Sequence, residues 1–286
     1  MPTPHPEAPA LRARDGLRLH WREWPAATPR GTVLIVHGLG EHIERYAHVA
    51  AHLNTAGWNV AGWDHRGHGQ SEGPRGGINE SDDLLHDLAA AIAQARQRLP
   101  GGPLVVLGHS MGGLIAARFV AGGLEPTAPA WWQPIDALVL SSPALDPGIS
   151  RAQRVAIALG QLAPTLPGPN GLKPAWISRD PAVVAAYQAD PLVHGRITPR
   201  LAHFIVRNGE WVLEHAAQWK LPTLLMYGGA DRCVSPQGSA RFAEAAPAAS
   251  VRSHAFTGLY HEIFNEPEQR QVLGELTAWL DERFGR

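Results

Sequence analysis

Short apolar runs alternate along the chain with longer stretches whose apolar residues recur at helical spacing. Runs typical of buried strands occupy residues 32–36, 58–63, 104–107, 135–140, 222–227 and 251–256. Between and after them, the pattern predicts helices at residues 45–55, 81–99, 114–120, 236–246 and 267–284. Strands that alternate with helices indicate βαβ crossovers. We therefore expect an α/β fold with a mostly parallel central sheet flanked by helices.

The N-terminal end departs from this rhythm. Residues 1–10 are rich in proline and predict a flexible tail. Apolar and polar residues then alternate on either side of Asp15-Gly16, which predicts a hairpin over residues 11–24.

Residues 143–219 interrupt the alternation of strands and helices. They contain helical stretches at residues 152–162 and 181–187 but no strong strand. A segment of this length is too long for a structureless loop. We interpret it as a helical cap, or lid, inserted into a core formed by residues 11–142 and 220–286.

Composition and charge narrow the classes of partner and location. The formal net charge is −1 and no basic run occurs, so a nucleic-acid partner is not expected. No stretch is apolar enough to span a bilayer, and no secretory signal is recognisable. Cys233 is the only cysteine, which excludes an internal disulfide and fits a cytoplasmic protein.

Five residues between the predicted strand at 104–107 and the predicted helix at 114–120 read Gly108-His109-Ser110-Met111-Gly112. The pattern G-x-S-x-G between a strand and a helix is typical of a nucleophile elbow, a strained turn that exposes the serine hydroxyl above the sheet. A side chain two residues before or after the serine would collide with neighbouring backbone, and glycine avoids this. Ser110 is therefore the candidate nucleophile.

A serine hydroxyl needs a base to take its proton and a third group to orient that base. In a sheet of this topology the partners follow the serine in the order acid, then histidine, each after a later strand. Asp231 follows the strand at 222–227, and His261 follows the strand at 251–256. These positions make Asp231 the candidate acid and His261 the candidate base.

Other residues compete for these roles. Asp146 follows the strand after the nucleophile helix, from which an acid can also reach the histidine; its alternative is a hinge residue of the cap. His109 is expected to point away from the serine. His37 and His42 precede the nucleophile, which is the wrong place for the base, although they could line the site. Cys233 is a rival nucleophile, but the topology places no histidine for it, and we interpret it as a small, half-buried residue.

Acyl transfer also needs donors for the oxyanion. The backbone N–H of Met111, the residue after the nucleophile, is one expected donor. The loop HGLG at residues 37–40 follows the strand at 32–36, and the N–H of Leu39 is its best candidate donor. A third loop, at residues 64–71, is interpreted as a turn braced by Asp64 and Arg66, with a substrate role as the alternative.

Six runs along the chain combine into one pattern. They are HGLGEH with RY at 37–46, DHRGHGQSEG at 64–73, GHSMGG at 108–113, DPL at 190–192, ADR at 230–232 and YHE at 260–262. Together they resemble the monoacylglycerol lipase and lysophospholipase group of the α/β-hydrolase superfamily, over residues 33–280. The resemblance implies an α/β-hydrolase fold with Ser110, Asp231 and His261 as catalytic residues and the Leu39 and Met111 amides as oxyanion donors. It also implies hydrolysis of monoacylglycerols through an acyl-enzyme, without a metal or an organic cofactor.

The cap is expected to determine substrate choice. One face of its first predicted helix carries Ala152, Val155, Ala156, Leu159 and Leu162. Packing of this face onto the core is the favoured interpretation; an acyl tunnel or weak contact with a lipid surface is the alternative. Leu159 and Leu192 are the candidate substrate-binding residues.

The sequence leaves several functions to be compared. A small lipid ester, monoacylglycerol, is the favoured substrate. A lysophospholipase or a short-chain carboxylesterase would use the same residues, and cleavage of amides or peptides is more remote. A non-catalytic ligand-binding protein is disfavoured because every position of the triad is filled. An epoxide hydrolase or haloalkane dehalogenase would carry aspartate at position 110.

Overall fold

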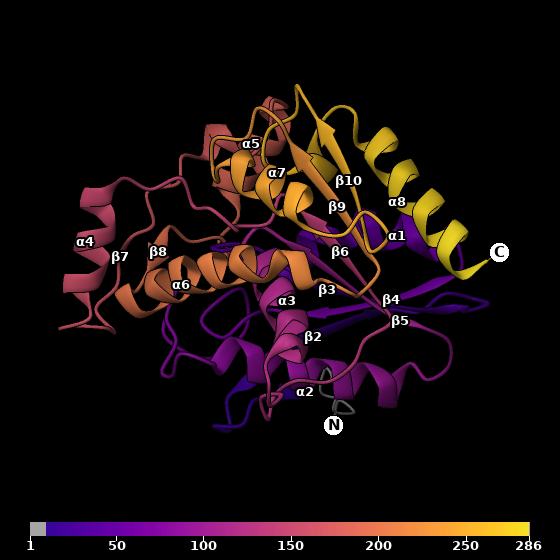
Figure 1. Ribbon diagram of the computed structural model, residues 1–286, viewed down its shortest axis with the longest axis horizontal. Helices are drawn as coiled ribbons and strands as arrows, with labels where there is room; N and C mark the ends of the chain where they lie inside the picture. The colour runs from indigo at the N-terminus through magenta and orange to yellow at the C-terminus, as the bar shows by residue number, and fades with distance from the viewer. Residues whose placement is uncertain (1–9, 286) are drawn as a thin grey trace, which may run out of the picture.

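The computed structural model describes residues 10–285, and an eight-stranded sheet forms its centre (Figure 1). In spatial order the strands are β1 (Ala10–Arg12), β2 (Arg18–Trp24), β4 (Trp58–Trp63), β3 (Gly31–Val36), β5 (Leu104–His109), β6 (Ala137–Ser141), β9 (Thr223–Gly228) and β10 (Val251–Phe256). Strand β2 pairs antiparallel with both β1 and β4, and the other neighbours pair parallel. The predicted mostly parallel sheet is confirmed.

Helices cover both faces of the sheet (Figure 1). On one face lie α1 (Ala47–Thr55) and α8 (Gln269–Phe284), and on the other lie α2 (Asp83–Arg98), α3 (Met111–Ala121) and α7 (Pro236–Ala245). Successive side chains of a strand point to opposite faces, so each central strand supplies both layers. Short 3₁₀ helices complete the core at η1 (Ile43–Tyr46), η2 (Gly122–Leu124), η4 (Ala216–Gln218) and η5 (Ile263–Asn265).

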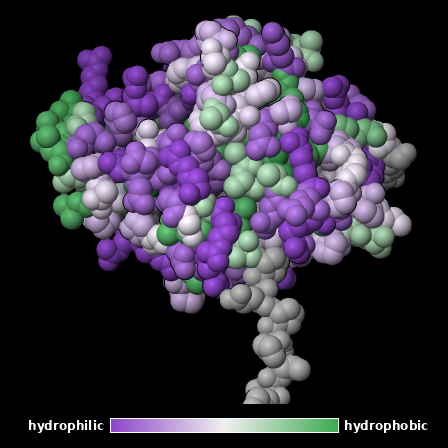
Figure 2. All heavy atoms as spheres, turned by 90° about the horizontal axis from the view of Figure 1, so that it is seen from below, coloured by the Kyte–Doolittle hydropathy of each residue, from purple (hydrophilic) through white to green (hydrophobic). Residues whose placement is uncertain are grey.

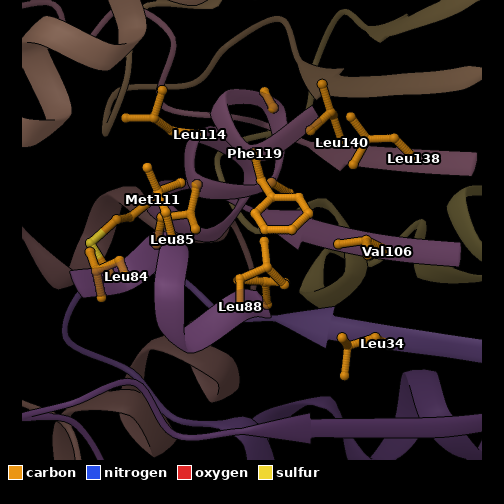
Figure 3. Packing of buried hydrophobic residues seen from close by; sticks show 14 of the residues in the cluster. Leu34, Leu84, Leu85, Leu88, Val106, Met111, Leu114, Phe119, Leu138 and Leu140 are labelled. Atoms are coloured by element: carbon orange, nitrogen blue, oxygen red, sulfur yellow. The ribbon is translucent and has the colours of Figure 1, made fainter. Parts of the chain in front are cut away.

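The packing of β3 illustrates how the two layers form. Leu34 belongs to the core cluster that includes α2 and α3, whereas Val33 and Ile35 belong to the cluster that includes α1 and α8. Figure 3 shows Leu34 on the same side as Phe119 of α3. Because both faces are buried, the strand is apolar at nearly every position, which explains why its sequence is a continuous apolar run.

The chain between β6 and β9 forms an insertion, which we define as residues 143–219. It contains α4 (Arg151–Gly160), η3 (Pro174–Trp176), α5 (Pro181–Ala189) and α6 (Pro199–His215), with two short strands, β7 (Gly168–Pro169) and β8 (Arg196–Ile197). Helices α4 and α5 lie close to the two predicted stretches. Helix α6 is the longest of the insertion and was not predicted.

Helix α6 has clear sequence signals in retrospect. The Thr198 side chain accepts a hydrogen bond from the backbone of Leu201, and Pro199 occupies the first turn. Leu201, Phe204 and Ile205 recur at helical spacing and are buried in the cluster that contains α3. The helix therefore attaches the insertion to the core.

Helix α4 differs from what its pattern predicts. Its N-terminus carries a capping box formed by Ser150 and Gln153, but none of its residues is buried. Leu159 and Leu162 are 63% and 90% exposed, so the expected packing of this face onto the core is wrong. The helix lies at the edge of the molecule, where the core offers no surface for that face, and Figure 2 shows an apolar patch at that edge.

The remaining expectations concern the N-terminal end. The predicted hairpin is present as the antiparallel pair of β1 and β2. The predicted tail at residues 1–10 lies outside the described residues except for Ala10, which belongs to β1. No helix within residues 10–285 combines the length and apolar character needed to cross a bilayer.

Candidate active site

Ser110 occupies a strained turn between β5 and α3. Its φ of 55° and ψ of −119° lie outside the regions that a serine adopts readily. A Cβ atom added to Gly108 would come within 2.5 Å of the Gly112 carbonyl oxygen, and one added to Gly112 within 2.0 Å of the Val36 carbonyl oxygen. Only glycine fits at these positions, and the turn holds the serine at the carboxyl end of the central strand.

The structure brings the side chains of Ser110, His261 and Asp231 together. His261 Nε2 lies 2.8 Å from Ser110 Oγ, and His261 Nδ1 lies 2.7 Å from Asp231 Oδ2. All three residues are less than 10% exposed. In the neutral imidazole, Nδ1–H donates to the carboxylate and Nε2 accepts from the serine hydroxyl, which is the tautomer that a general base requires.

Asp231 is held by its own loop as well as by the histidine. The backbone N–H groups of Cys233 and Val234 donate to Asp231 Oδ1 at 2.7 and 3.1 Å, which leaves Oδ2 for His261. Burial alone lowers the pKa of His261, but the charge and hydrogen bond of Asp231 outweigh burial, and the pKa lies above its usual value. The carboxylate thus favours the imidazolium that forms when the serine gives up its proton.

Asp146, the rival acid, lies in a different arrangement. Its Oδ2 accepts from Arg241 Nη2 at 2.7 Å, and its Oδ1 accepts from the backbone N–H of Gly148 at 2.9 Å. The backbone carbonyl of Asp146 also accepts from Ser235. These contacts fit a hinge residue at the start of the insertion.

The other candidate histidines have partners outside the triad. His109 Nδ1 lies 3.1 Å from Ser141 Oγ, while its ring lies 4.7 Å from the His261 ring. Burial, followed by the proximity of His261, lowers the pKa of His109 to about 4, so it is a neutral neighbour. His42 Nε2 lies 2.7 Å from Asp190 Oδ2 in the insertion.

His37 is fully buried beneath the loop after β3. Its Nε2 accepts from the backbone N–H of His65 at 2.9 Å, and its Nδ1 lies 2.8 Å from the Gly38 carbonyl oxygen. Both ring nitrogens are therefore used by the backbone of two loops. His37 supports these loops and does not line the cavity.

The surroundings of Cys233 differ from those expected from the sequence. One donor atom from each of Asp231, Cys233 and His261 lies within 4.8 Å of the others, so the expectation that no histidine is placed near this thiol is wrong. By distance alone the three could share a metal ion. However, Asp231 and His261 already bond to one another, and burial followed by the charge of Asp231 raises the pKa of the thiol. A protonated thiol is a poor ligand and a poor nucleophile.

Leu39 and Met111 lie beside Ser110 and line the same cavity. The loop after β3 passes close to the serine, since a Cβ atom on Gly38 would lie 3.1 Å from Ser110 Cβ. The Gly38 N–H donates to Glu41 Oε1 at 2.6 Å, which fixes the backbone immediately before Leu39. Both expected oxyanion residues therefore lie next to the candidate nucleophile.

A cavity of about 290 Å³ opens on Ser110. Most of its lining comes from the insertion and is apolar, including Ile149, Ala156, Ile157, Ile205 and Val206, with Gln153 and Asn170 as polar members. None of its lining residues, all within the described part of the chain, carries a charged side chain.

The two substrate-binding candidates of the insertion lie elsewhere. Leu159 and Leu192 are absent from the lining of this cavity, because Leu159 faces solvent on α4 and Leu192 lies in the turn after α5. On α4 the residues Ala156 and Ile157 take the place expected for Leu159.

The loop at residues 64–71 is a braced turn, as the favoured interpretation expected. The two carboxylate oxygens of Asp64 accept from the backbone N–H groups of Ile43 and Gln70, each at 2.8 Å. Arg66 is buried and pairs with Asp87 at 2.7 Å. These contacts use the charged side chains of the loop within the protein.

Sequence reasoning missed two sets of residues near the site. The first is the lining from α6, namely Ala202, Ile205 and Val206, which the Thr198-Pro199 helix start could have revealed. The second is an ionic cluster of Glu41, Arg45 and Glu262 beside the triad. Its members lie in recognisable runs, and Glu41 and Arg45 are only four positions apart, but no spacing rule pairs Arg45 with Glu262, which is 217 positions away.

Comparison with known proteins agrees with this geometry. Residues 27–268 match the family model described as serine aminopeptidase, S33. Monoacylglycerol lipase of Mycolicibacterium smegmatis is 39% identical over 270 residues, 93% of each protein. Human monoglyceride lipase is 31% identical, over 98% of this chain and 92% of its own length.

A solved structure extends the likeness to the fold. The crystal structure of Paleococcus ferrophilus monoacylglycerol lipase superposes with a TM-score of 0.79 at 34% identity, covering 93% of this chain and 99% of that one. The α/β-hydrolase fold and the resemblance seen in the sequence motifs are both confirmed. The chain belongs to the serine aminopeptidase S33 family of α/β-hydrolases, in the group that contains the monoacylglycerol lipases.

Proposed function

We propose that the protein is a serine hydrolase that cleaves monoacylglycerols into a fatty acid and glycerol. The observation that carries the proposal is the opening of an apolar, uncharged cavity directly onto Ser110, whose hydroxyl is hydrogen-bonded to His261. Relatives named monoacylglycerol or monoglyceride lipase, at 30–39% identity over nearly the whole chain, support the same substrate.

The first half of the reaction forms an acyl-enzyme. His261 Nε2 takes the proton of the Ser110 hydroxyl as its oxygen attacks the ester carbonyl, and Asp231 stabilises the resulting imidazolium. The carbonyl oxygen becomes an oxyanion that accepts hydrogen bonds from the Leu39 and Met111 amides. Collapse of this intermediate breaks the ester bond, and His261 protonates the departing glycerol oxygen.

The second half releases the fatty acid. Water takes the place of glycerol, gives a proton to His261 and attacks the acyl carbonyl, and the same two amides stabilise the oxyanion. The Ser110 oxygen then leaves with the proton held by His261, and the free fatty acid departs. None of these steps needs a metal or an organic cofactor.

The lining of the cavity favours an acyl chain over a peptide. An aminopeptidase must bind a charged terminal amine, and a carboxylate is the side chain suited to that task. The residues around this cavity include no such carboxylate, whereas isoleucine, valine, leucine and alanine provide apolar contacts. We therefore place the acyl chain of the substrate in the cavity.

We further propose that the insertion, residues 143–219, acts as a cap that selects the substrate. It supplies Ile149, Ala156, Ile157 and Ile205 to the cavity, so changes in its sequence would alter the space beside Ser110. Leu159 and Leu192 are not assigned to substrate binding in this proposal, because neither lines that space.

The exposed face of the insertion is suited to a lipid surface. Val155, Leu159, Leu162 and Leu166 are between 58% and 90% exposed, and they gather in and just after α4 (Figure 2). Burial of such side chains among acyl chains is favourable. We propose weak contact with lipid assemblies through this patch, from which the substrate would enter.

The cytoplasmic location suggested by the sequence stays a prediction.

A substrate series separates this proposal from its alternatives. Purified protein would be assayed on monoacylglycerols of increasing chain length, the matching lysophospholipids, short nitrophenyl esters and an aminoacyl amide, with Ser110→Ala as the control. We expect the highest kcat/KM on monoacylglycerols. A higher kcat/KM on lysophospholipids or on short esters would identify a different substrate and leave the proposed mechanism unchanged. Cleavage of the amide alone would contradict the assignment as an ester hydrolase.

A further inference from the structure

Arg45 binds two buried carboxylates that belong to different loops around the triad. Its Nη1 donates to Glu41 Oε2 at 2.5 Å and to Glu262 Oε1 at 2.7 Å, and its Nη2 donates to Glu262 Oε2 at 2.7 Å. The three side chains are 11% exposed or less. A forked, charge-assisted pair of this kind fixes orientation as well as distance.

Glu41 connects this cluster to the loop beside the nucleophile. Its Oε1 accepts from the Gly38 backbone N–H at 2.6 Å and from the Tyr46 hydroxyl at 2.7 Å. Gly38 precedes Leu39, whose N–H is the proposed oxyanion donor. The Glu41 carboxylate therefore holds the His37–Gly38 peptide, which directly precedes the peptide that carries the Leu39 N–H.

Glu262 connects the same cluster to the loop of the base. It follows His261 directly in the chain, and Asn265 donates to its Oε2 at 2.8 Å. Arg45 and Glu262 are 217 positions apart in the sequence. The chain itself does not fix the distance between their two segments, so the ion pair is what holds them at a fixed separation.

Arg45 and Glu262 stabilise one another's charged forms, and the cluster is closed on the side of the insertion. Burial alone would lower the pKa of Arg45 and raise that of Glu262, but their attraction outweighs burial and shifts both in the opposite direction. The Tyr187 ring of α5 lies 4.8 Å from Arg45 Cζ. Buried ion pairs often contribute little to stability compared with apolar packing. A buried arginine that is bonded to two carboxylates is therefore more readily explained by the need to position the loops that carry them.

We propose that Arg45 is a positioning residue for the hydrolysis, because by holding Glu41 and Glu262 together it sets the Leu39 amide relative to the His261 imidazole. The inference rests on the proposed function, which assigns those two groups to the reaction. Arg45 does not line the cavity, and its side chain touches the loops on which the reacting groups are carried. Its loss should therefore affect the chemical step and leave binding of the acyl chain unchanged.

The test compares Arg45→Gln, Arg45→Lys and a matched control. Misplacement of the two loops should lower kcat by on the order of 100-fold with KM within a few-fold of wild type. Lysine should restore only part of kcat, because one ammonium group cannot bind both carboxylates as a fork does. Arg118→Gln is the control: Arg118 is 12% exposed, pairs with Glu125 and lies at the far end of α3 from Ser110. Its kcat should stay within a few-fold of wild type.

A second variant, Glu262→Gln, keeps the shape of the side chain and removes one charge. The groups that face His261 are Asp231, Glu262 and Glu41, which raise its pKa, and the neutral His109 and Cys233. Without the Glu262 charge the pKa of His261 should fall, so the acid limb of kcat/KM should move to lower pH. Because both changes break one bridge, the losses in kcat of Arg45→Gln and Glu262→Gln should not be additive.

Different results would contradict the positioning role of Arg45 and the proposed function on which it rests. If folded Arg45→Gln keeps kcat, or loses it no more than Arg118→Gln, the positioning role is wrong. If Arg45→Gln fails to fold, Glu262→Gln decides: unchanged kcat and an unchanged pH profile would overturn the proposal. A wild-type protein without esterase activity, or a fully active Ser110→Ala, would instead overturn the proposed function.

Discussion

Three side chains from loops far apart in the sequence meet at the carboxyl edge of the sheet. Two hydrogen bonds, of 2.8 and 2.7 Å, connect Ser110 through His261 to Asp231. The two backbone N–H groups on Asp231 Oδ1 leave its other oxygen directed at the imidazole. The orientation of the His261 imidazole therefore depends on the Asp231 carboxylate.

Asp231→Asn and Asp146→Asn form a matched pair of substitutions. Asparagine at position 231 can donate to His261 Nδ1 and so favour the wrong tautomer, and we expect kcat to fall by on the order of 10⁴-fold. Asp146 is paired with Arg241, and its substitution should leave kcat within a few-fold of wild type. Steady-state kinetics on one ester with both proteins checks this, and the reverse ranking would move the acid to position 146.

The elements around Ser110 are packed without spare room. The elbow requires β3, β5 and the start of α3 to approach so closely that a single methyl group has no space at Gly112. The loops that follow β3 and β4 are joined by buried histidines, whose ring nitrogens bond to backbone groups of these two loops. The half-buried His194 of the insertion adds a contact from its Nε2 to the Gly67 carbonyl oxygen at 3.1 Å. The close packing and the hydrogen bonds between these loops therefore stabilise the fold and also determine the geometry of the site.

Gly112→Ala and Gly274→Ala should act in opposite directions. The new Cβ at position 112 would lie 2.0 Å from the Val36 carbonyl oxygen, and we expect a loss of about 3 kcal/mol in the free energy of unfolding. Gly274 is exposed within α8 and has no atom within 4 Å of an added Cβ, so alanine should stabilise the protein by about 0.5–1 kcal/mol. Urea denaturation measures both; equal stability of the two variants would contradict the packing described for the elbow.

Buried histidines should make the protein sensitive to acid. Burial lowers the pKa of His65, His109 and His194 to about 4. Between about pH 6.5 and pH 4 the unfolded chain binds protons at these positions that the folded protein does not, so stability must fall as the pH falls. Each unit of lowered pKa corresponds to about 1.4 kcal/mol. Denaturation midpoints measured from pH 8 to pH 4.5 should decline steadily below pH 6.5, and a flat profile would show that these groups titrate normally.

Much of this organisation could be predicted from the sequence, and the exceptions have physical reasons. The approach of Asp231 and His261 to Ser110 could be predicted because strand order determines which loops reach the sheet edge. The exposure of Leu159 could not be predicted, because the sequence of an apolar helical face does not show whether the core, a cavity or solvent lies opposite it. The bridge from Arg45 to Glu262 depends on the tertiary meeting of two distant loops, which no local pattern records.

The whole molecule presents two distinct surfaces near the site. The insertion covers Ser110 with apolar side chains on its inner side, while α4 and the turn after it expose further apolar side chains on the outer side. Figure 1 shows α4 at one edge of the molecule, away from α8, and Figure 2 shows an apolar patch at that edge. This arrangement is the basis for our proposal that substrate held in lipid assemblies enters the cavity from that edge.

Leu162→Ser tests the role of the outer patch. Leu162 is 90% exposed and does not line the cavity, so its replacement should leave kcat/KM on a soluble short-chain ester unchanged. Because insertion of a leucine side chain into lipid is worth about 1.5–3 kcal/mol, binding to phosphatidylcholine vesicles should weaken by roughly 10-fold or more. Co-sedimentation with vesicles measures the binding, and equal binding of variant and wild type would contradict contact through this patch.

In the proposed reaction, Ser110 is acylated by a monoacylglycerol in a site completed by His261 and Asp231. The most direct measurement is the release of free fatty acid and glycerol from a long-chain monoacylglycerol by the wild-type protein and by Ser110→Ala. We expect equimolar release of both products by the wild type, and none above the uncatalysed rate by the variant. No release by the wild type, or undiminished release by Ser110→Ala, would contradict the proposed reaction.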